Sequence, residues 1–518
     1  MLTFAAEAMP ELNAESVGML KIALGVYIVF LLGLSIVASR RVKNEEDYLI
    51  AGRRLPLFLA WGTLMATWFG AATMFAAAES ARDEGLRGVI LDPFACAATL
   101  VFAGLFFARP LWRMKLLTMA DFYRQKYGEK AEILGASIQI PSYFAWIALQ
   151  YTALSRILAT YFQIPFSHGV LYSAAVTLIY TLVGGMWSVT LTDTLQIVVA
   201  LFGLLVLAFT VFSQPELGDG SAFRGVSVMV EKLTESHPDH LSLMPGMSGV
   251  LIMGWIAAWA TGLFGNIPGQ DLQQRVFASK DEKTASRACI LAGVLYFAFG
   301  LIPVSLGLAS HVTHPELEGE PVAFLAGHYL SPGMLIVFVI AVVSMVVSTA
   351  TSAVLAPATL LGHNLLNRLP ALRERALLRD RLCVVLVSIG GVVLALQGQG
   401  MMELLDMALS IQLVALFIPV AMGIYGKPRG ELSAVLAMSF GFTAWAIRFL
   451  AEQVFLPIPE HLAETYEYYH DYLAAEFPVE GLRTAASSLA VIPEDFYGFG
   501  FSAVGYLLGQ AILKRRES

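Results

Sequence analysis

The most informative stretch of the chain reads Val346-Val347-Ser348-Thr349-Ala350-Thr351-Ser352-Ala353. It places four hydroxyls within five residues, inside an apolar run from about 334 to 361 that is long enough to cross a bilayer as a helix. On a helix, Ser348 shares a face with Thr351 and Ser352. Hydroxyl oxygens in a dry place replace part of the hydration shell of a small monovalent cation without the cost of a buried carboxylate. The stretch therefore predicts a cation site within a membrane-spanning helix.

A structural alternative accounts for the same hydroxyls. Serine and threonine in spanning helices often donate back to the carbonyl one turn earlier, or bond to a neighbouring helix. The density of hydroxyls is compatible with both interpretations.

The composition places the chain in a membrane. Of its 518 residues, 57% are hydrophobic and 14% are charged, whereas a soluble chain carries about a quarter charged residues. We therefore expect an all-α polytopic protein of the cell (plasma or inner) membrane, forming one transmembrane domain over 1–518 with the lipid bilayer as a partner. The basic residues fall in short, scattered loops, so we expect no nucleic-acid partner. Cys96, Cys289 and Cys383 lie in apolar runs and are expected to be buried hydrophobes.

Thirteen apolar runs predict about thirteen transmembrane helices. They lie near 17–39, 56–78, 86–108, 131–162, 168–185, 190–213, 248–267, 286–310, 333–361, 382–398, 402–425, 431–456 and 498–514. Loops rich in Lys and Arg are cytoplasmic. The tail before the first run has no basic residue and is not expected to be a cleavable signal, whereas every second loop after it is basic. The pattern predicts an N-terminus outside and a cytoplasmic C-terminus.

Two runs contain residues that interrupt a helix. One is Ala66-Thr67-Trp68-Phe69-Gly70-Ala71-Ala72-Thr73 in the second run, and the other is Thr261-Gly262-Leu263-Phe264-Gly265-Asn266-Ile267-Pro268-Gly269-Gln270-Asp271 at the end of the seventh. Glycine and proline loosen a helix and free backbone carbonyls. The two runs enter the membrane with opposite polarity, as in an inverted five-plus-five repeat with discontinuous first helices. The alternative is that these glycines only allow close helix packing.

Four motifs follow one another along the chain. In order, they are Glu45-Glu46-Asp47-Tyr48-Leu49-Ile50-Ala51-Gly52-Arg53-Arg54-Leu55-Pro56, Tyr180-Thr181-Leu182-Val183-Gly184-Gly185-Met186-Trp187-Ser188-Val189-Thr190-Leu191-Thr192-Asp193-Thr194-Leu195-Gln196, Gln274-Arg275 and Ser348-Thr349. Through them, the chain resembles the sodium/solute symporter family over about residues 20 to 450. The resemblance implies a LeuT-like fold with core repeats near 56–213 and 248–425, one helix before them (17–39) and two after (431–514).

The resemblance also implies where the coupling ion, Na+, binds. In family members of known architecture, sodium lies between the first and eighth core helices, which are the second and ninth runs here. The implied ligands of this first site are the carbonyls of Ala66, Phe69 and Met345 and the hydroxyls of Ser348 and Thr349. Some members, such as sialic acid transporters, hold a second sodium ion, whose ligands map onto Asp193, Ser348, Thr351 and Ser352. Asp193 lies near the edge of its run, so a solvated or hydrogen-bonded carboxylate is the alternative there.

Within the family, the chain looks most like the high-affinity choline transporters, whose aromatic box holds a quaternary ammonium by ring faces. Trp68 and Trp146 match two box positions, but the third tryptophan position is Gly269. We expect this departure to open volume beside Asp271, so that the solute is not choline or is held differently. Packing in the bundle is the alternative role for both tryptophans. The candidate solute-binding residues are Trp68, Asp92, Trp146, Gly269, Gln270, Asp271 and Gln412.

Together, these features predict a sodium-coupled symporter that imports a small polar organic solute, amine-bearing, by alternating access. The alternative is a membrane sensor that signals through a separate partner, because only Lys514 to Ser518 follow the last run. We expect no enzyme, because the runs hold no HExxH or comparable cluster. Charged residues inside runs should face the interior or pair, and Arg156 is expected to pair with a carboxylate, while Asp406 has no assigned partner. The loop near 457–497 is predicted to be an ordered extracellular cap.

Overall fold

The computed structural model describes residues 14–217, 220–246, 249–317, 319–398, 400–455 and 492–517. Within these ranges the regular structure is helical, and one isolated parallel bridge joins Leu55 to Ser279. Nine helices of the described part, or up to eleven with two bent pairs, are long and apolar enough to cross a membrane. The predicted all-α membrane class is confirmed, whereas the count of thirteen stays a prediction. Most of the predicted cap near 457–497 lies outside the described residues.

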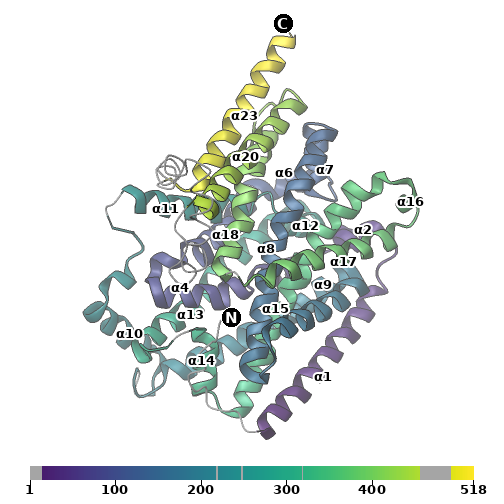
Figure 1. The fold of residues 1–518 in the computed structure, drawn as a ribbon. Helices are drawn as coiled ribbons and strands as arrows, with labels where there is room; N and C mark the ends of the chain where they lie inside the picture. Colours follow the sequence, from purple (N-terminus) through teal and green to yellow (C-terminus); the bar gives the residue numbers. More distant parts are fainter. Residues whose placement is uncertain are drawn as a thin grey trace, which may run out of the picture.

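The helices follow one another through short connections (Figure 1). The first part of the chain forms α1 (Ala14–Ser39), α2 (Glu45–Ile50), η1 (Ala51–Arg53), α3 (Leu57–Trp68), η2 (Ala72–Ala76), α4 (Ala77–Glu84), η3 (Gly85–Val89), η4 (Ile90–Ala95), α5 (Cys96–Phe102), η5 (Ala103–Phe107), α6 (Ala108–Arg113), α7 (Met119–Lys126), α8 (Glu129–Phe162), α9 (Phe166–Phe212), α10 (Ala222–Ser236) and η6 (Pro238–Leu241). The second part forms α11 (Gly249–Ala260), η7 (Thr261–Gly265), α12 (Gln270–Ala278), α13 (Glu282–Thr313), α14 (Pro321–Tyr329), α15 (Pro332–Thr359), η8 (Leu360–Leu365), η9 (Leu366–Arg368), α16 (Pro370–Arg373), α17 (Ala376–Ala395), α18 (Met401–Gln412), η10 (Leu413–Phe417), α19 (Ile418–Tyr425), α20 (Glu431–Phe455) and α23 (Glu494–Glu517).

Both predicted interruptions are present. Helix α3 ends at Trp68, and the chain turns by 58° before it continues from Ala72. A Cβ on Gly70 would lie 2.5 Å from Thr349 Oγ1, so glycine is what lets the break approach α15 this closely. In the seventh run, η7 ends at Gly265 and α12 begins only at Gln270. The breaks free backbone groups at two places in the core of the bundle, as discontinuous helices do in transporters.

The fifth and sixth predicted runs are two parts of α9, which kinks at Gly185. This glycine has φ +53°, a left-handed conformation that residues with a side chain rarely adopt. A Cβ there would lie 2.5 Å from Cδ2 of Tyr48, and the Tyr48 hydroxyl donates to the carbonyl of Thr181 at 3.4 Å. The first and second sequence motifs therefore pack against each other, and the kink brings α2 onto the bundle.

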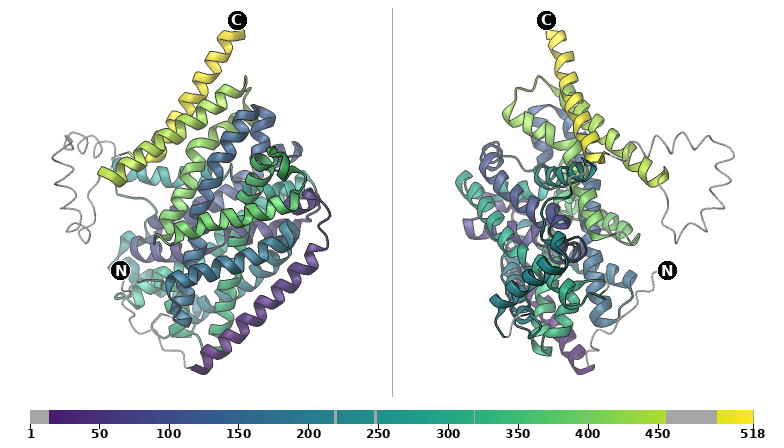
Figure 2. Two further views of the ribbon diagram at one scale, coloured as in Figure 1. Left: turned by 45° about the vertical axis from the view of Figure 1, so that its right-hand side comes forward. Right: turned by 90° about the vertical axis from the view of Figure 1, so that its left-hand side faces the viewer.

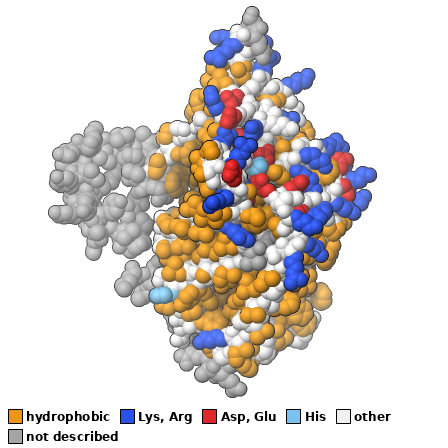
Figure 3. Space-filling model, turned by 90° about the vertical axis from the view of Figure 1, so that its right-hand side faces the viewer, with side chains coloured by type: hydrophobic (Ala, Val, Ile, Leu, Met, Phe, Trp, Pro, Cys, Tyr) orange, Lys and Arg blue, Asp and Glu red, His pale blue; other side chains and the backbone are white. Residues whose placement is uncertain are grey.

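The molecule has two unlike ends separated by an apolar belt. Helices α10 and α14 lie at one end, and α7 and α16 lie at the other, beyond which α20 and α23 project as a pair (Figures 1 and 2). Figure 3 shows a broad hydrophobic face in the lower half of the view, with most of the visible Lys and Arg gathered in the upper half. On α1, Ile22, Val26 and Val29 are 65–70% exposed, as expected for side chains that face lipid.

Candidate binding site

The hydroxyls of α15 meet the last turn of α3 next to its break. Ser348 Oγ and Thr349 Oγ1 lie 3.3 Å and 3.1 Å from the carbonyl oxygen of Ala66, to which both donate. Thr349 Oγ1 also lies 3.3 Å from the carbonyl oxygen of Met345. Phe69 closes α3 with ψ 77°, which turns its carbonyl out of the helical direction. The carbonyls of Ala66 and Met345 and the hydroxyls of Ser348 and Thr349 thus come together in a buried place. These four oxygens are neutral and suit a small hard cation.

A carboxylate adjoins this group through a shared hydroxyl. Asp193 of α9 accepts hydrogen bonds from Thr63 at 2.6 Å and from Ser348 at 2.5 Å. Ser348 therefore contacts one residue named for each of the two predicted sodium sites, Ala66 and Asp193. Thr351 forms no hydrogen bond with Asp193 in the described structure. Its hydroxyl donates to the Ser348 carbonyl at 2.8 Å, and the residue lines a small polar pocket with residues of α1 and α9.

Arg275 was noted in the sequence as part of a motif but was not predicted to lie at this site. Its fully buried guanidinium lies 4.0 Å from Asp193 Oδ2 and donates to Ser352 Oγ at 2.5 Å. It also donates to the backbone carbonyl of Asp271 at 2.8 Å. Asp193 therefore has a cation within the chain itself. The sequence places Arg275 between the seventh and eighth predicted runs, so the rule that a charge inside a span pairs with another gave no signal for it.

The solute candidates centre on Asp271, just after the second break. The indole N–H of Trp68 donates to Asp271 Oδ2 at 2.7 Å, and the hydroxyl of Tyr143 donates to Oδ1 at 2.5 Å. The Tyr143 ring lies 5.8 Å from the partly exposed ring of Trp146. One buried carboxylate and three aromatic rings, contributed by α3, α8 and α12, thus form one group. Tyr143 was not predicted, because an isolated tyrosine in an apolar run carries no local signal.

The expectation of open volume beside Gly269 is corrected. A Cβ at this position would lie 2.8 Å from Asp271 Oδ1 and 2.9 Å from the carbonyl of Asn266. The Asp271 carboxylate therefore occupies the direction in which a larger residue would extend. Gln412 stays close, because its Oε1 lies 3.6 Å from the same Cβ position and accepts from Gln139 at 3.3 Å.

Two further candidates lie apart from the tryptophan rings. Gln270 accepts from the backbone N–H of Met119 at 2.7 Å, which ties it to the start of α7. Asp92 accepts from Thr73 at 2.9 Å and from the hydroxyl of Tyr296 at 2.7 Å. Tyr296 Oη also lies 3.2 Å from the carbonyl of Trp68, so Asp92 reaches the break through this tyrosine. Sequence analysis did not identify Tyr296 for the same reason as Tyr143.

Two interrupted helices, with hydroxyls and a buried carboxylate near their breaks, form an arrangement that is typical of secondary transporters. A family model described as the sodium:solute symporter family matches residues 48–441. The chain belongs to the sodium:solute symporter family. It is thus a multi-pass membrane protein of a family that couples sodium to the symport of small organic solutes, and the predicted family is confirmed.

Relatives with known roles and solved structures agree with this assignment. A high-affinity choline transporter of Drosophila melanogaster is 27% identical over 449 residues, which are 81% of this chain and 69% of that protein. A sodium/pantothenate symporter of Haemophilus influenzae is 27% identical over 335 residues, which are 62% of this chain and 67% of that protein. A solved Na+-coupled sialic acid symporter, outward-open and substrate-bound, has a TM-score of 0.72 at 17% identity, covering 96% of this chain and 97% of that one. A solved transporter of the nucleobase-cation-symport-1 family has a TM-score of 0.53 at 15% identity, and the match covers 90% of this chain and 99% of that one. The predicted LeuT-like fold is therefore confirmed.

Proposed function

We propose that the protein couples sodium entry to uptake of a small amine-bearing solute, and that sodium binds at the α3 break. The ligands are the carbonyls of Ala66, Phe69 and Met345 and the hydroxyls of Ser348 and Thr349. The observation that carries the proposal is the convergence of both hydroxyls on one carbonyl, that of Ala66, at 3.1–3.3 Å. Neutral oxygens compensate for the lost hydration of Na+ and disfavour larger or more highly charged ions.

The amine follows from the group around Asp271. Its carboxylate is 5% exposed, and its two described side-chain donors, Trp68 and Tyr143, are neutral. An ammonium group placed between these rings would gain an ion pair with Asp271 and cation–π contacts, worth about 0.5–2 kcal/mol per ring. The choline transporters among the relatives support a cationic or zwitterionic solute over a sugar or a simple acid.

A second sodium ion at Asp193, Ser348, Thr351 and Ser352 would share its carboxylate with Arg275. The Arg275 guanidinium lies 4.0 Å from Asp193 and donates to Ser352. An ion that enters here therefore has to compete with a positive charge that is fixed to the chain. We therefore infer that occupancy of this second site is linked to the position of Arg275 in the transport cycle.

The proposal includes the orientation of the protein in the membrane. The basic end, near α7 and α16, faces the cytoplasm of the plasma or inner membrane, with the N-terminus outside and the C-terminus inside. Counterflow of a labelled amine in liposomes tests the transport function, because a sensor that needs a separate partner moves no solute. Sodium-stimulated counterflow that unlabelled amines abolish is the expected result. Counterflow of a sugar or an acid that no amine competes with would contradict the proposed solute class.

A further inference from the structure

A second group of carboxyl and hydroxyl oxygens lies away from the site described above. Thr261, at the start of η7, donates to Asp495 Oδ2 of α23 at 2.6 Å. The side chain of Ser410, on α18, adjoins the same carboxylate. Asp495 is 7% exposed and Ser410 is 1% exposed. Asp495 Oδ1 and Ser410 Oγ are buried without a hydrogen-bond partner among the described residues. Two buried oxygens of this group thus lack the partners that such atoms normally have.

The charge of this group is negative and uncompensated within the described residues. Asp406 precedes Ser410 by one helical turn and shares its face of α18. The charges that act on Asp406 are those of Asp495 and Glu494, both acidic. No Lys, Arg or His of the described ranges forms an ion pair with Asp406 or Asp495. Carboxylates inside a membrane bundle normally pair with a cation or take up a proton.

A contact of the same kind occurs in the group around Asp193. In the first repeat, Thr63 of the interrupted helix donates to Asp193 of α9, at 2.6 Å. In the second repeat, Thr261 of the interrupted helix donates at the same distance to Asp495, which belongs to α23 and so lies outside both repeats. In the first group Arg275 supplies the positive charge, whereas in the second no described side chain does so.

We propose that Asp406, Ser410, Asp495 and Thr261 form a further sodium site, on the side of the membrane opposite to Asp193. A shared proton would require a hydrogen bond between the two carboxyl groups, and none joins them in the described structure. Oxygen ligands select a hard cation, and calcium needs about six to eight of them. Two carboxylates and two hydroxyls fit Na+ better. Asp406 is partly exposed, which gives the ion a way in past the buried Asp495.

Equilibrium binding of radioactive sodium to the purified full-length protein, without solute, tests this site. The starting variant carries Ser348→Ala and Thr349→Ala, which removes ligands of both inner sites. We expect it to retain one bound sodium per chain. Adding Asp406→Asn should raise the half-saturating sodium concentration at least about tenfold, which corresponds to about 1.4 kcal/mol. Ser410→Ala should give a smaller rise, and Glu403→Gln, on the exposed face of α18, should change nothing.

Several outcomes overturn the proposal and leave the function proposed above intact. The starting variant could bind no sodium, or Asp406→Asn could leave its binding unchanged. Displacement of sodium by calcium at a lower concentration than sodium itself requires would show a divalent site instead. Proton release on changing pH, with no sodium bound, would show a proton site. Where the starting variant does not fold, Asp406→Asn in the wild-type chain should lower the number of bound sodium ions by one, and an unchanged number overturns the site.

Discussion

Arg275 Nη2 lies 4.0 Å from Asp193 Oδ2, and both side chains are fully buried. The pair joins α12, just after the second break, to α9, which packs beside α15 and α3. Removing one partner from a buried pair leaves an uncompensated charge and costs about 3–5 kcal/mol. The contact thus ties the second interrupted helix to α9, where Asp193 also accepts from Thr63 of the first interrupted helix, and any ion at Asp193 has to act on this pair.

The first prediction concerns this pair. Asp193→Asn keeps the acceptor for Thr63 but leaves Arg275 without its counter-charge, so the melting temperature should fall. Asp193→Asn combined with Arg275→Gln should recover part of the loss, because neither charge then remains, and a thermal-unfolding mutant cycle measures the coupling. For transport, a second ion at Asp193 predicts a sodium Hill coefficient above one that Asp193→Asn lowers to about one. A wild-type coefficient of one, with sodium and solute moving one to one, excludes that ion.

The second prediction concerns the first sodium site. Ser348→Ala and Thr349→Ala each remove one of about five ligands in a dry place, so each should raise the half-saturating sodium concentration roughly tenfold or more. Thr349→Ser is the matched control, since it keeps the hydroxyl that lies 3.1 Å from Ala66 O. Sodium activation of uptake is the measurement. Alanine variants that match the wild type would place sodium elsewhere.

A third prediction separates solute binding from packing at Trp68. Trp68→Leu removes both the ring face and the N–H that bonds Asp271 at 2.7 Å. Solute Km should rise about 2- to 30-fold, the range of one cation–π contact, with a smaller effect on sodium activation. Trp68→Phe keeps a ring face, so its solute Km should lie between those of the wild type and Trp68→Leu. Equal effects on solute and sodium in both variants would mean that Trp68 only packs.

Gly269→Trp provides a fourth prediction. The new side chain would start 2.8 Å from Asp271 Oδ1, so it has to displace that carboxylate from its bonds with Trp68 and Tyr143. Preference should shift toward smaller amines, measured by competition with a series of increasing size. Gly269→Ala is the milder companion and should weaken all amines without changing their order. An unaltered profile for Gly269→Trp would remove position 269 from the solute site.

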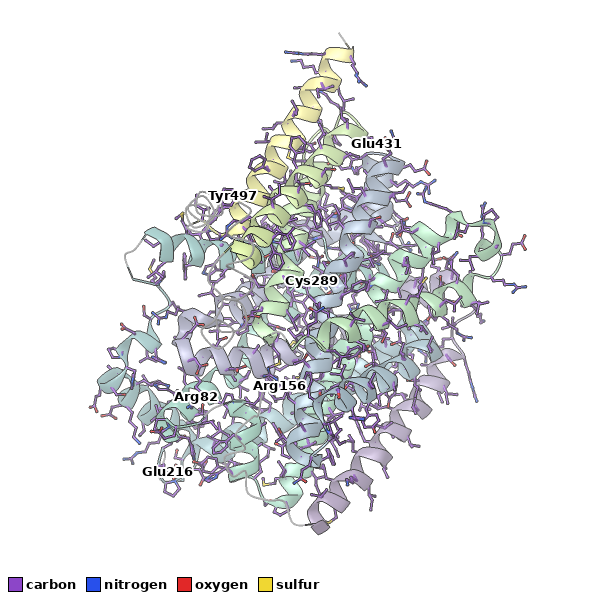
Figure 4. The ribbon with its side chains drawn as sticks, viewed as in Figure 1. Arg82, Arg156, Glu216, Cys289, Glu431 and Tyr497 are labelled. Atoms are coloured by element: carbon purple, nitrogen blue, oxygen red, sulfur yellow. The ribbon has the colours of Figure 1, made fainter. Side chains whose placement is uncertain are left out.

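A fifth prediction concerns Arg156, for which a carboxylate partner was expected and is found. Figure 4 labels Arg156 within the bundle. Its guanidinium pairs with Glu320, before α14, and lies 3.9 Å from Glu79 of α4. Breaking this bridge should loosen α14 from α8 and α4. Arg156→Gln should therefore speed reaction of an introduced Ala153→Cys, beside the same pocket, with a membrane-impermeant thiol reagent. Native cysteines are buried and give little background. Arg156→Lys should have a smaller effect. Equal rates of thiol modification in all variants would show that the bridge does not restrict access to position 153.

Sequence patterns predicted the parts of this molecule that are local. Glycine and proline marked both breaks, because loss of helical hydrogen bonds depends on those residues themselves. The hydroxyls of Ser348 and Thr349 were identifiable because they share one helix. Tyr143, Tyr296 and Arg275 were not assigned, since their partners lie on helices distant in the chain and no periodicity records which helices meet.

The same limit explains the error at Gly269. A missing side chain was expected to leave space, but which neighbour fills that space depends on how the chain turns after the second break. There, Asp271 folds back between Trp68 and Tyr143. Local sequence contains the glycine and the carboxylate but not the direction in which the carboxylate points.

The most direct test is uptake of a labelled small amine into liposomes that contain the purified protein, driven by an inward sodium gradient. We predict accumulation above equilibrium that collapses when a sodium ionophore dissipates the gradient. Thr349→Ala should need much more sodium for the same rate, and Thr349→Ser should stay close to wild type. Uptake that proceeds equally with potassium in place of sodium, or that Thr349→Ala leaves unchanged, would contradict the account of coupling at the α3 break.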